Sequence, residues 1–531
     1  MQVCGGKRIA AFASYHCISS HLESERVRLP FPERIPVQYA VSFAALLCIA
    51  QLVEGTTATF SLCSFFFIIV ATLAFNLAGG LTRASGGYVF FYAVLAVIVG
   101  LFWKVVLGEP GNSNLTQPVV TIEGALGCII AMYFAVFVSR KLTRKRAFLG
   151  DVVKPGDMFR AAIGCLVFGL AILLAVLVLP RQQGSVLSAL NQVNQFLPLA
   201  IILGTIAQIR KSGGKSSLSL PALLAGTIVF TFGLISFSKQ GMFTPPLCWL
   251  IAAASQRYRI SLYQFAGFAF AIFLMGHYLV PYSQYGRNYQ ADTFFGNVPI
   301  AASLLSRPEY VRQQAEQQVA ESNEEEQSGY FNTSEGLFDR LQMISPDDAI
   351  INVTQDNGPI GLAPIVLEFE NVIPHFLWPG KPVIEIGNMY AHEIGSIAPD
   401  DHSTGISFSP LGEAYHTEGW LGIFGLAPAL WIVLFVVFDS LCGDVRKDPW
   451  GLLAIILFAH EAPEGMLGGI FYMLVYGAIG IIFAAITAGY LMPILGALFV
   501  GEKRSGLRRN LAVRSIPRRL PPVRSPQNPG Q

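Results

Sequence analysis

The sequence predicts an all-α protein: a polytopic membrane helical bundle of about twelve transmembrane helices with one large extracytoplasmic loop. Hydrophobic residues make up 53% of the 531 residues and charged residues only 13%, a balance that a soluble chain of this length does not keep. The hydrophobic residues fall in long runs separated by short polar joints, and most runs approach the roughly 20 residues that a helix needs to cross a bilayer.

Residues 1–36 are expected to form a cytoplasmic N-terminal tail. The segment contains five cationic residues but lacks the apolar core and the small-residue cleavage site of a signal peptide. We therefore expect it to be retained.

Residues 37–281 and 419–490 are expected to form the two parts of the transmembrane bundle. Three of the runs are short, so tilted, broken or re-entrant helices are expected among them. The expected spans are 37–54, 58–79, 87–107, 118–138, 159–180, 195–209, 219–237, 242–255, 262–281, 419–438, 450–461 and 466–490.

Cationic residues recur in alternate joints between these spans, which predicts the orientation of the chain. Both termini, including a basic tail over 491–531, are expected in the cytoplasm, and the long segment 282–418 on the other side, the periplasm of a bacterium. The joints expected in the cytoplasm carry Arg83; Arg140, Lys141, Arg144, Lys145, Arg146 and Lys154; Arg210, Lys211 and Lys215; Arg257 and Arg259; and Arg446 and Lys447.

The insertion 282–418 changes character along its length. Residues 312–326 are rich in Gln and Glu, which is typical of a solvated helix or a linker. From Phe331 onward, apolar runs such as 360–369 are interrupted by prolines. This pattern predicts short helices lying against the membrane rather than an independent domain.

Titratable side chains concentrate between Val372 and Trp420, just before the chain re-enters the bilayer. Such a group suits a substrate with an apolar anchor and an anionic head, because cations can hold phosphate while a carboxylate or an imidazole takes a proton. The simpler alternative is a set of solvated loop residues. The group consists of His375, Lys381, Glu385, His392, Glu393, Asp400, Asp401, His402, Glu413, His416 and Glu418.

Charged residues near the membrane ends have their own expected roles. Lys104 and Glu123 lie near the outer ends of two consecutive spans, and we expect them to pair because an unpaired charge there is costly. Arg287 lies just outside a span, where a guanidinium either holds a lipid diphosphate or contacts lipid headgroups.

The sequence predicts no metal site and no cofactor. Asp400, Asp401 and His402 are consecutive, but adjacent residues rarely converge on one ion, and no HExxH motif supports them. The eight cysteines show neither a disulfide framework nor zinc spacing, and none lies between Cys248 and Cys442.

Two motifs near the end of the insertion carry a resemblance. Residues 373–382 read IPHFLWPGKP, residues 407–410 read SFSP, and residues 412–422 read GEAYHTEGWLG. In order and position they resemble the bacterial O-antigen polymerase family, which polymerises oligosaccharide repeat units. The chain departs from the family pattern at His375, where arginine is commoner, and at Thr417 and Glu418, which replace Asn-Phe.

The resemblance implies a GT-C-like bundle and glycosyl transfer at the outer face of the bacterial cytoplasmic membrane. The substrate would be an undecaprenyl diphosphate-linked oligosaccharide, and the partners a chain-length regulator and a flippase of the same pathway, with no nucleic acid. The implied catalytic base is Glu413 or His416. The implied substrate-binding residues are Arg287 and Lys381 on the diphosphate, His375 and His392 in secondary positions, and Tyr415 against a sugar ring.

Two other functions remain open from the sequence. An O-antigen ligase shares the overall plan, but the Trp-Pro-x-Lys-Pro and Gly-Glu-x-Tyr elements favour a polymerase. A transporter or flippase without chemistry would be expected to place its ionisable groups near the bilayer midplane. Here those groups collect outside the spans.

Overall fold

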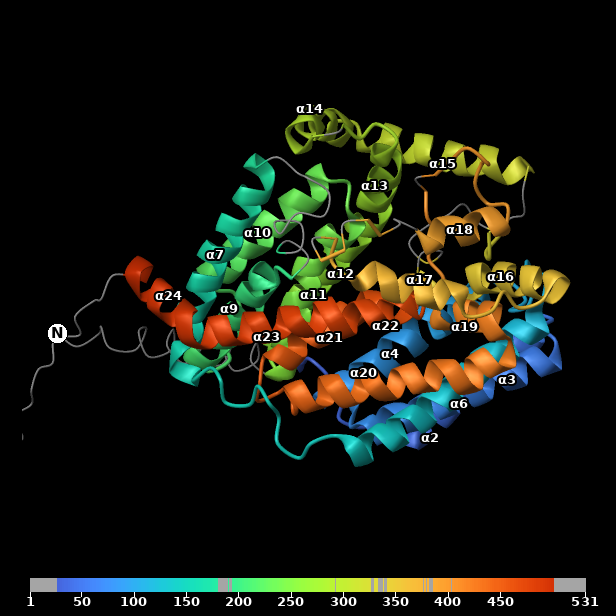
Figure 1. Cartoon of the computed structure of the whole chain (residues 1–531), viewed down its shortest axis with the longest axis horizontal. Helices are drawn as coiled ribbons and strands as arrows, with labels where there is room; N and C mark the ends of the chain where they lie inside the picture. The colour runs from blue at the N-terminus through green and yellow to red at the C-terminus, as the bar shows by residue number, and fades with distance from the viewer. Residues whose placement is uncertain are drawn as a thin grey trace, which may run out of the picture.

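The computed structural model is almost entirely helical (Figure 1). It describes residues 26–500 apart from 180–189, 191–192, 292, 326–328, 333–337, 339–340, 376, 379, 382–384 and 403. The expected tail over 491–531 therefore lies outside the described residues from residue 501 onward, and so do the first 25 residues.

Each of the twelve predicted spans coincides with a helix. Apolar runs form helices because a helix satisfies every backbone polar group within one segment, which lipid requires. The first nine are α2 (Val37–Val53), α3 (Ala58–Ala78), α4 (Ala84–Phe91) continued by η2 (Tyr92–Ile98) and α5 (Val99–Val106), α6 (Pro118–Leu142), α7 (Met158–Val178), α9 (Phe196–Lys211), α10 (Leu220–Ile235), α11 (Lys239–Ser255), and α12 (Leu262–Leu274) continued by η4 (Met275–Leu279) and α13 (Val280–Arg287).

The last three predicted spans follow the insertion. The final helix runs on to Val500, ten residues beyond the predicted end of the bundle. These helices are η6 (Gly422–Leu426) with α20 (Ala427–Cys442), α21 (Trp450–Glu464), and the continuous series α22 (Gly468–Tyr472), η7 (Met473–Gly477), α23 (Ala478–Ile486), η8 (Thr487–Leu491) and α24 (Met492–Val500).

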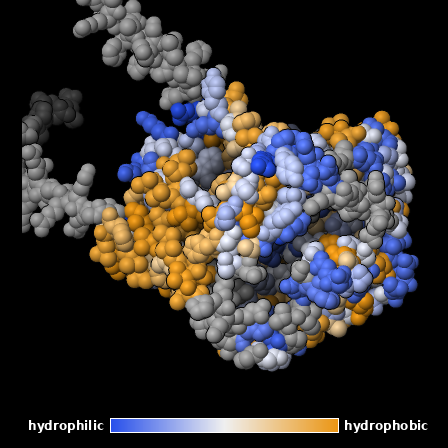
Figure 2. Space-filling view, turned by 90° about the horizontal axis from the view of Figure 1, so that it is seen from above, coloured by the Kyte–Doolittle hydropathy of each residue, from blue (hydrophilic) through white to orange (hydrophobic). Residues whose placement is uncertain are grey.

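Seven of these twelve helices are long and apolar enough to cross a membrane: Ala58–Thr82, Ala84–Val106, Pro118–Leu142, Met158–Val178, Leu262–Arg287, Gly422–Cys442 and Gly468–Phe499. The other five, α2, α9, α10, α11 and α21, have 15 to 17 residues. Large hydrophobic side chains on α7 and α24, such as Val178 and Leu498, are exposed. They lie at the end of the molecule where Figure 2 shows a broad hydrophobic patch, as expected of a lipid-facing surface.

The insertion folds into short helices, as predicted, and some of them pack on the bundle. The Gln- and Glu-rich stretch forms most of α15, which lies with α14 along one edge of the molecule (Figure 1). Contacts join α16 to α6 and α17 to α22. The helices are α14 (Phe294–Leu305), α15 (Pro308–Glu325), α16 (Ile344–Asn357), α17 (Ala363–Val372), α18 (Ile386–Glu393) and α19 (Pro410–Glu418).

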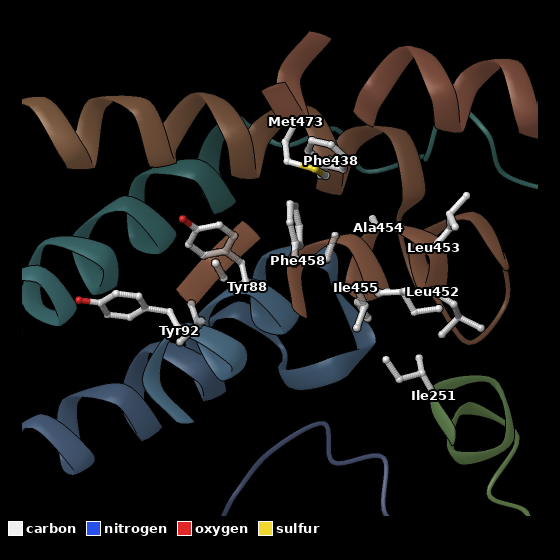
Figure 3. Packing of buried hydrophobic residues seen from close by; sticks show 14 of the residues in the cluster. Tyr88, Tyr92, Ile251, Phe438, Leu452, Leu453, Ala454, Ile455, Phe458 and Met473 are labelled. Carbon is white, nitrogen blue, oxygen red and sulfur yellow. The ribbon is translucent and has the colours of Figure 1, made fainter. Parts of the chain in front are cut away.

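Aromatic side chains pack the centre of the bundle. Phe458 of α21 lies between Tyr88 of α4 and Phe438 of α20 (Figure 3), with ring centroids 5.2 and 5.0 Å away. All three side chains are buried. Edge-to-face aromatic pairs of this kind add to the free energy of burial, so they help to hold α4, α20 and α21 together.

The bundle also contains short segments between its helices. The turns η1 (Gly80–Thr82) and η3 (Pro155–Asp157) are 3-10 helices. Strands β1 (Val27–Arg28) and β2 (Arg259–Ile260) pair antiparallel and tie the segment before α2 to the turn between α11 and α12.

The predicted partner of Lys104 was wrong. The Lys104 amine lies 2.7 Å from a carboxylate oxygen of Glu109 and 2.8 Å from the Ser113 hydroxyl. Both partners come from the turn directly after the lysine's own helix, and Tyr330 of the insertion packs on the amine at 4.8 Å. The counter-charge of Lys104 therefore comes from Glu109, in the turn after its own helix, and not from Glu123 of α6.

Candidate functional site

Helix α19 carries three of the predicted site residues, and its start is fixed by a carboxylate from α16. Asp347 accepts hydrogen bonds from the Ser409 N–H at 2.9 Å and the Ser409 hydroxyl at 2.5 Å. A further bond comes from the Gly412 N–H. These hydrogen bonds, from groups at the start of the helix, hold α19 in place.

The next residue, Asp348, binds the N-terminus of the membrane helix α6 in the same way. It accepts hydrogen bonds from the Thr116 and Gln117 N–H groups at 2.6 and 2.9 Å and from the Thr121 hydroxyl at 2.8 Å. These donors surround the N-terminus of α6. Two consecutive aspartates therefore connect a membrane helix, α16 and α19.

Glu413 of α19 is completely buried, and both of its carboxylate oxygens accept hydrogen bonds. Its carboxylate accepts the Leu467 N–H at 2.6 Å and the Tyr390 hydroxyl at 3.2 Å, and also the Gly468 N–H. The two N–H groups belong to the start of α22. Glu413 thus joins the insertion to the last membrane helix.

A second carboxyl group, Glu368 of α17, lies close to Glu413, and the two groups interact electrostatically. Burial raises the pKa of Glu368 well above its ordinary value, and the neighbouring Glu413 raises it further. Burial raises the pKa of Glu413 as well, but the hydrogen bonds that Glu413 accepts oppose this rise, so Glu368 is the group of the pair that binds a proton more readily. A Cβ atom at Gly468 would lie 2.1 Å from an oxygen of Glu368, so only glycine permits this approach.

His416 lies one turn further along α19 and is also buried. Its Nε2 atom lies 2.8 Å from a carboxylate oxygen of Glu393, and its Nδ1 atom lies 2.8 Å from the Thr354 hydroxyl. Because Thr354 donates to the Ile350 carbonyl at 2.7 Å, its hydroxyl accepts from Nδ1. Both ring nitrogens of His416 are thus hydrogen-bonded, one to a carboxylate and one to a hydroxyl.

Tyr390 connects the two halves of this network. Its hydroxyl reaches Glu413, and its ring meets the His416 ring edge to face at 5.0 Å. Glu413, His416 and Tyr390 are at most 1% exposed, whereas the Glu393 side chain is 32% exposed. Glu393 is therefore the end of the network that an external molecule can reach.

Tyr415 does not present its ring to a ligand. It is 4% exposed, its hydroxyl accepts a hydrogen bond from the Gln355 amide, and its ring meets the edge of Trp420 at 5.7 Å. Trp420 is 42% exposed. The accessible aromatic surface beside α19 therefore belongs to Trp420, which the prediction had not assigned to the sugar.

Lys381 directs its amine to backbone carbonyls rather than outward. The amine donates to the carbonyls of Asn371 and Ile373, each at 2.6 Å, at the end of α17. A cation at a helix C-terminus is favourable, and Lys381 is only 8% exposed. It therefore fixes the helix that carries Glu368.

Three further predicted residues, His392, His375 and Arg287, do not take part in the hydrogen bonds of this network. His392 is next to Glu393 on α18, and its Nε2 atom lies 3.0 Å from the Asp401 carbonyl. His375 is half-buried in the turn after α17. Arg287 is exposed at the end of α13, where its guanidinium donates to the Phe237 carbonyl at 3.4 Å. The helix that carries it packs against α15, and Tyr282 and Tyr285 of this helix are buried in a separate hydrophobic cluster.

Sequence reasoning missed Glu368 and the aspartate pair, and it did not single out Tyr390 or Glu393. Glu368 had a detectable signal, because it is an acid within the apolar run 360–369 and a buried acid needs a partner. Asp347 and Asp348 had none, since their N–H partners are more than 60 and more than 200 residues away in sequence.

Within the part of the chain that the structure describes, no group of three or more His, Cys, Asp or Glu residues could hold a metal ion. The seven long apolar helices indicate a helical membrane protein, with a carboxylate and histidine network on its insertion. No family model, no curated protein and no solved structure matches the chain.

Proposed function

We propose that this protein is a membrane glycosyltransferase that polymerises lipid-linked oligosaccharide repeat units into O-antigen or exopolysaccharide. The substrate class comes from the resemblance of residues 373–382 and 407–422 to O-antigen polymerases. The observation that carries the chemistry is the Glu393–His416 contact, an accessible carboxylate backed by a buried imidazole at 2.8 Å. The proposed location is the bacterial inner membrane, with both termini cytoplasmic and the insertion in the periplasm.

The proposed step is a displacement at the anomeric carbon of the growing chain. A sugar hydroxyl of the next repeat unit attacks this carbon, and its proton passes to the Glu393 carboxylate. The bond from the anomeric carbon to the diphosphate oxygen breaks, and undecaprenyl diphosphate leaves with the electron pair. A base placed in this way contributes about 100-fold to 10,000-fold to such a rate.

The geometry favours the His416 side of the network for this role. Glu413 is buried and already accepts several hydrogen bonds, so a sugar hydroxyl cannot approach it without breaking the junction with α22. His416 acts through Glu393, because its Nε2 atom lies 2.8 Å from that carboxylate and orients it. Trp420, half-exposed beside α19, is the proposed surface for a sugar ring.

Arg287 is the proposed contact for the diphosphate, since its guanidinium is exposed and suits a bidentate phosphate contact. Lys381 takes no part in diphosphate binding in this proposal, because its amine already donates to two carbonyls at 2.6 Å. A chain-length regulator and a flippase of the same pathway are the proposed partners.

The test incubates the purified full-length protein in detergent with an undecaprenyl diphosphate-linked repeat unit and separates the products by size. A ladder of carrier-linked chains supports polymerisation. Consumption of carrier-linked glycan only after lipid A core is added indicates a ligase. Absence of any product with an authentic repeat unit removes the proposal and leaves transport, which a flux measurement in sealed vesicles then tests.

A further inference from the structure

Five cationic side chains line one cavity, and none of the described residues that line it belongs to the insertion that carries the candidate site. Its volume is about 560 Å³, and its walls come from the segment before α2, the turn after α9 and the turn between α11 and α12. All three segments are predicted to be cytoplasmic. The cations are Arg26, Arg28, Lys215, Arg257 and Arg259.

The two-stranded ribbon brings these arginines together. Arg28 lies directly opposite Arg259 in the antiparallel pair, so the two side chains share one face of the ribbon. The alternate residues Leu29, Tyr258 and Ile260 are buried on the bundle. Like charges directly opposite each other destabilise a strand pair. The pairing of the two strands nevertheless places both arginines at the cavity.

The backbone conformation of Arg257 is a second unfavourable feature of this cavity. It follows the end of α11 with a φ of 51°, in the left-handed region that normally takes glycine or asparagine at this point of a helix end. Its N–H donates to the Ala254 carbonyl at 2.8 Å, so the conformation is part of the turn. An arginine is thus held at the cavity at the expense of backbone strain.

None of the described residues that line the cavity is acidic; the other members are Ile209, Gly213, Gly214, Gln256 and Tyr258. Five cationic side chains thus gather at one cavity with no acid among its described lining residues, and such a group of cations attracts an anion. We propose that the cavity binds a phosphate-bearing ligand. Four guanidinium groups favour phosphate, because their planar N–H pairs match two phosphate oxygens.

The volume sets the size of this ligand. About 560 Å³ falls in the range of small-molecule sites, roughly 300–1,000 Å³, and is much larger than a single phosphate group. The phosphate is therefore carried on a larger molecule, either the headgroup of an anionic phospholipid or a soluble organic phosphate. This binding is separate from glycosyl transfer and stands or falls independently of it.

The experiment measures binding to the full chain in detergent by native mass spectrometry, with inorganic pyrophosphate as the soluble probe and phosphatidylglycerol as the lipid probe. The test variant is Arg28→Gln with Arg259→Gln. The control, Lys145→Gln with Arg146→Gln, removes the same charge from a predicted cytoplasmic joint outside the cavity. A Lys215→Gln variant replaces the test variant should the latter fail to fold.

We expect the dissociation constant of one probe to rise about tenfold or more in the test variant, since charge-assisted hydrogen bonds are lost, and to stay unchanged in the control. Loss of pyrophosphate binding identifies a soluble ligand, and loss of phosphatidylglycerol retention alone identifies a lipid. Binding of neither probe, or an equal loss in the control, overturns the proposal.

Thermal unfolding supplies a second readout. Without phosphate, the test variant should melt at a higher temperature than the natural chain because the repulsion between Arg28 and Arg259 is gone. Added pyrophosphate or phosphatidylglycerol should raise the melting temperature of the natural chain and of the control, but not that of the test variant. A test variant that melts lower under both conditions contradicts the proposed repulsion.

Discussion

The carboxyl groups of Glu368 and Glu413 interact inside the protein, where the charge of Glu413 adds to the effect of burial and raises the pKa of Glu368. Glu368 comes from α17 and Glu413 from α19, and Glu413 accepts the Leu467 N–H at the start of α22 across 2.6 Å. Two buried carboxyl groups therefore lie at the junction between the insertion and the last membrane helix. This junction, together with the Asp347 and Asp348 contacts, holds the candidate site rigidly on the bundle.

Replacing Glu413 by Gln should destabilise this junction. The substitution removes the charge that the Leu467 and Gly468 N–H groups surround, and hydrogen bonds to a charged group contribute about 1.5–3 kcal/mol. Thermal unfolding in one detergent should show a clearly lower melting temperature for Glu413→Gln. Glu368→Gln is the matched control, because it makes the same change at the neighbouring buried carboxyl group and leaves the Glu413 carboxylate and its bond from the Leu467 N–H in place. Equal melting temperatures for Glu413→Gln and the natural chain would rule out a structural role for the charge.

Asp347 should make stability depend on pH. Burial, assisted by Asp348 and opposed by the hydrogen bonds from Ser409 and Gly412, raises the pKa of Asp347 from 3.8 to about 7. The folded state therefore holds a proton that the unfolded state has released, so stability falls as the pH rises from about 4 to about 7.

The measurement compares the natural chain with the Asp347→Asn variant, which does not titrate at this position. Relative to the variant, the natural chain should lose a few kcal/mol across this range and no more above it. A difference in unfolding free energy that is constant from about pH 4 to about pH 8 would contradict the raised pKa.

Replacing Glu393 by Gln should abolish most of the proposed transfer while leaving the fold intact. The side chain is 32% exposed, so its loss has little effect on stability, whereas loss of a general base lowers kcat about 100-fold or more. Polymer ladders and initial rates measure this directly. Glu385→Gln, at the other end of α18, is the matched control and should remain active; full activity of Glu393→Gln would remove Glu393 from the mechanism.

Replacing Lys381 by Met should act on stability rather than on substrate affinity. The amine is bonded to two carbonyls at the end of α17, and its loss leaves buried acceptors unsatisfied, at about 1–3 kcal/mol. We expect a lower melting temperature, partly restored in Lys381→Arg, and an unchanged KM at a temperature where the variant is folded. A raised KM with an unchanged melting temperature would instead support a diphosphate contact.

The helices were predictable from the sequence to a large extent. Every apolar run expected to span the membrane coincides with a helix, from Val37–Val53 onward, because hydropathy and length are local properties and lipid leaves the backbone few alternatives. The division of the insertion into short helices was predictable for the same reason, since prolines interrupt its apolar runs. The end of the last helix was predicted less accurately, because that helix extends to Val500 rather than ending at residue 490.

Pairings between side chains were decided by the tertiary structure. The sequence drew attention to Glu413, His416 and Lys381, but packing placed Glu368 against Glu413, Glu393 against His416, and the Lys381 amine on carbonyls. Likewise Lys104 met Glu109 rather than Glu123. Composition determines where the chain is helical, whereas the long-range packing of those helices determines which buried charge meets which partner, because each buried polar group must find its partner within a few ångströms.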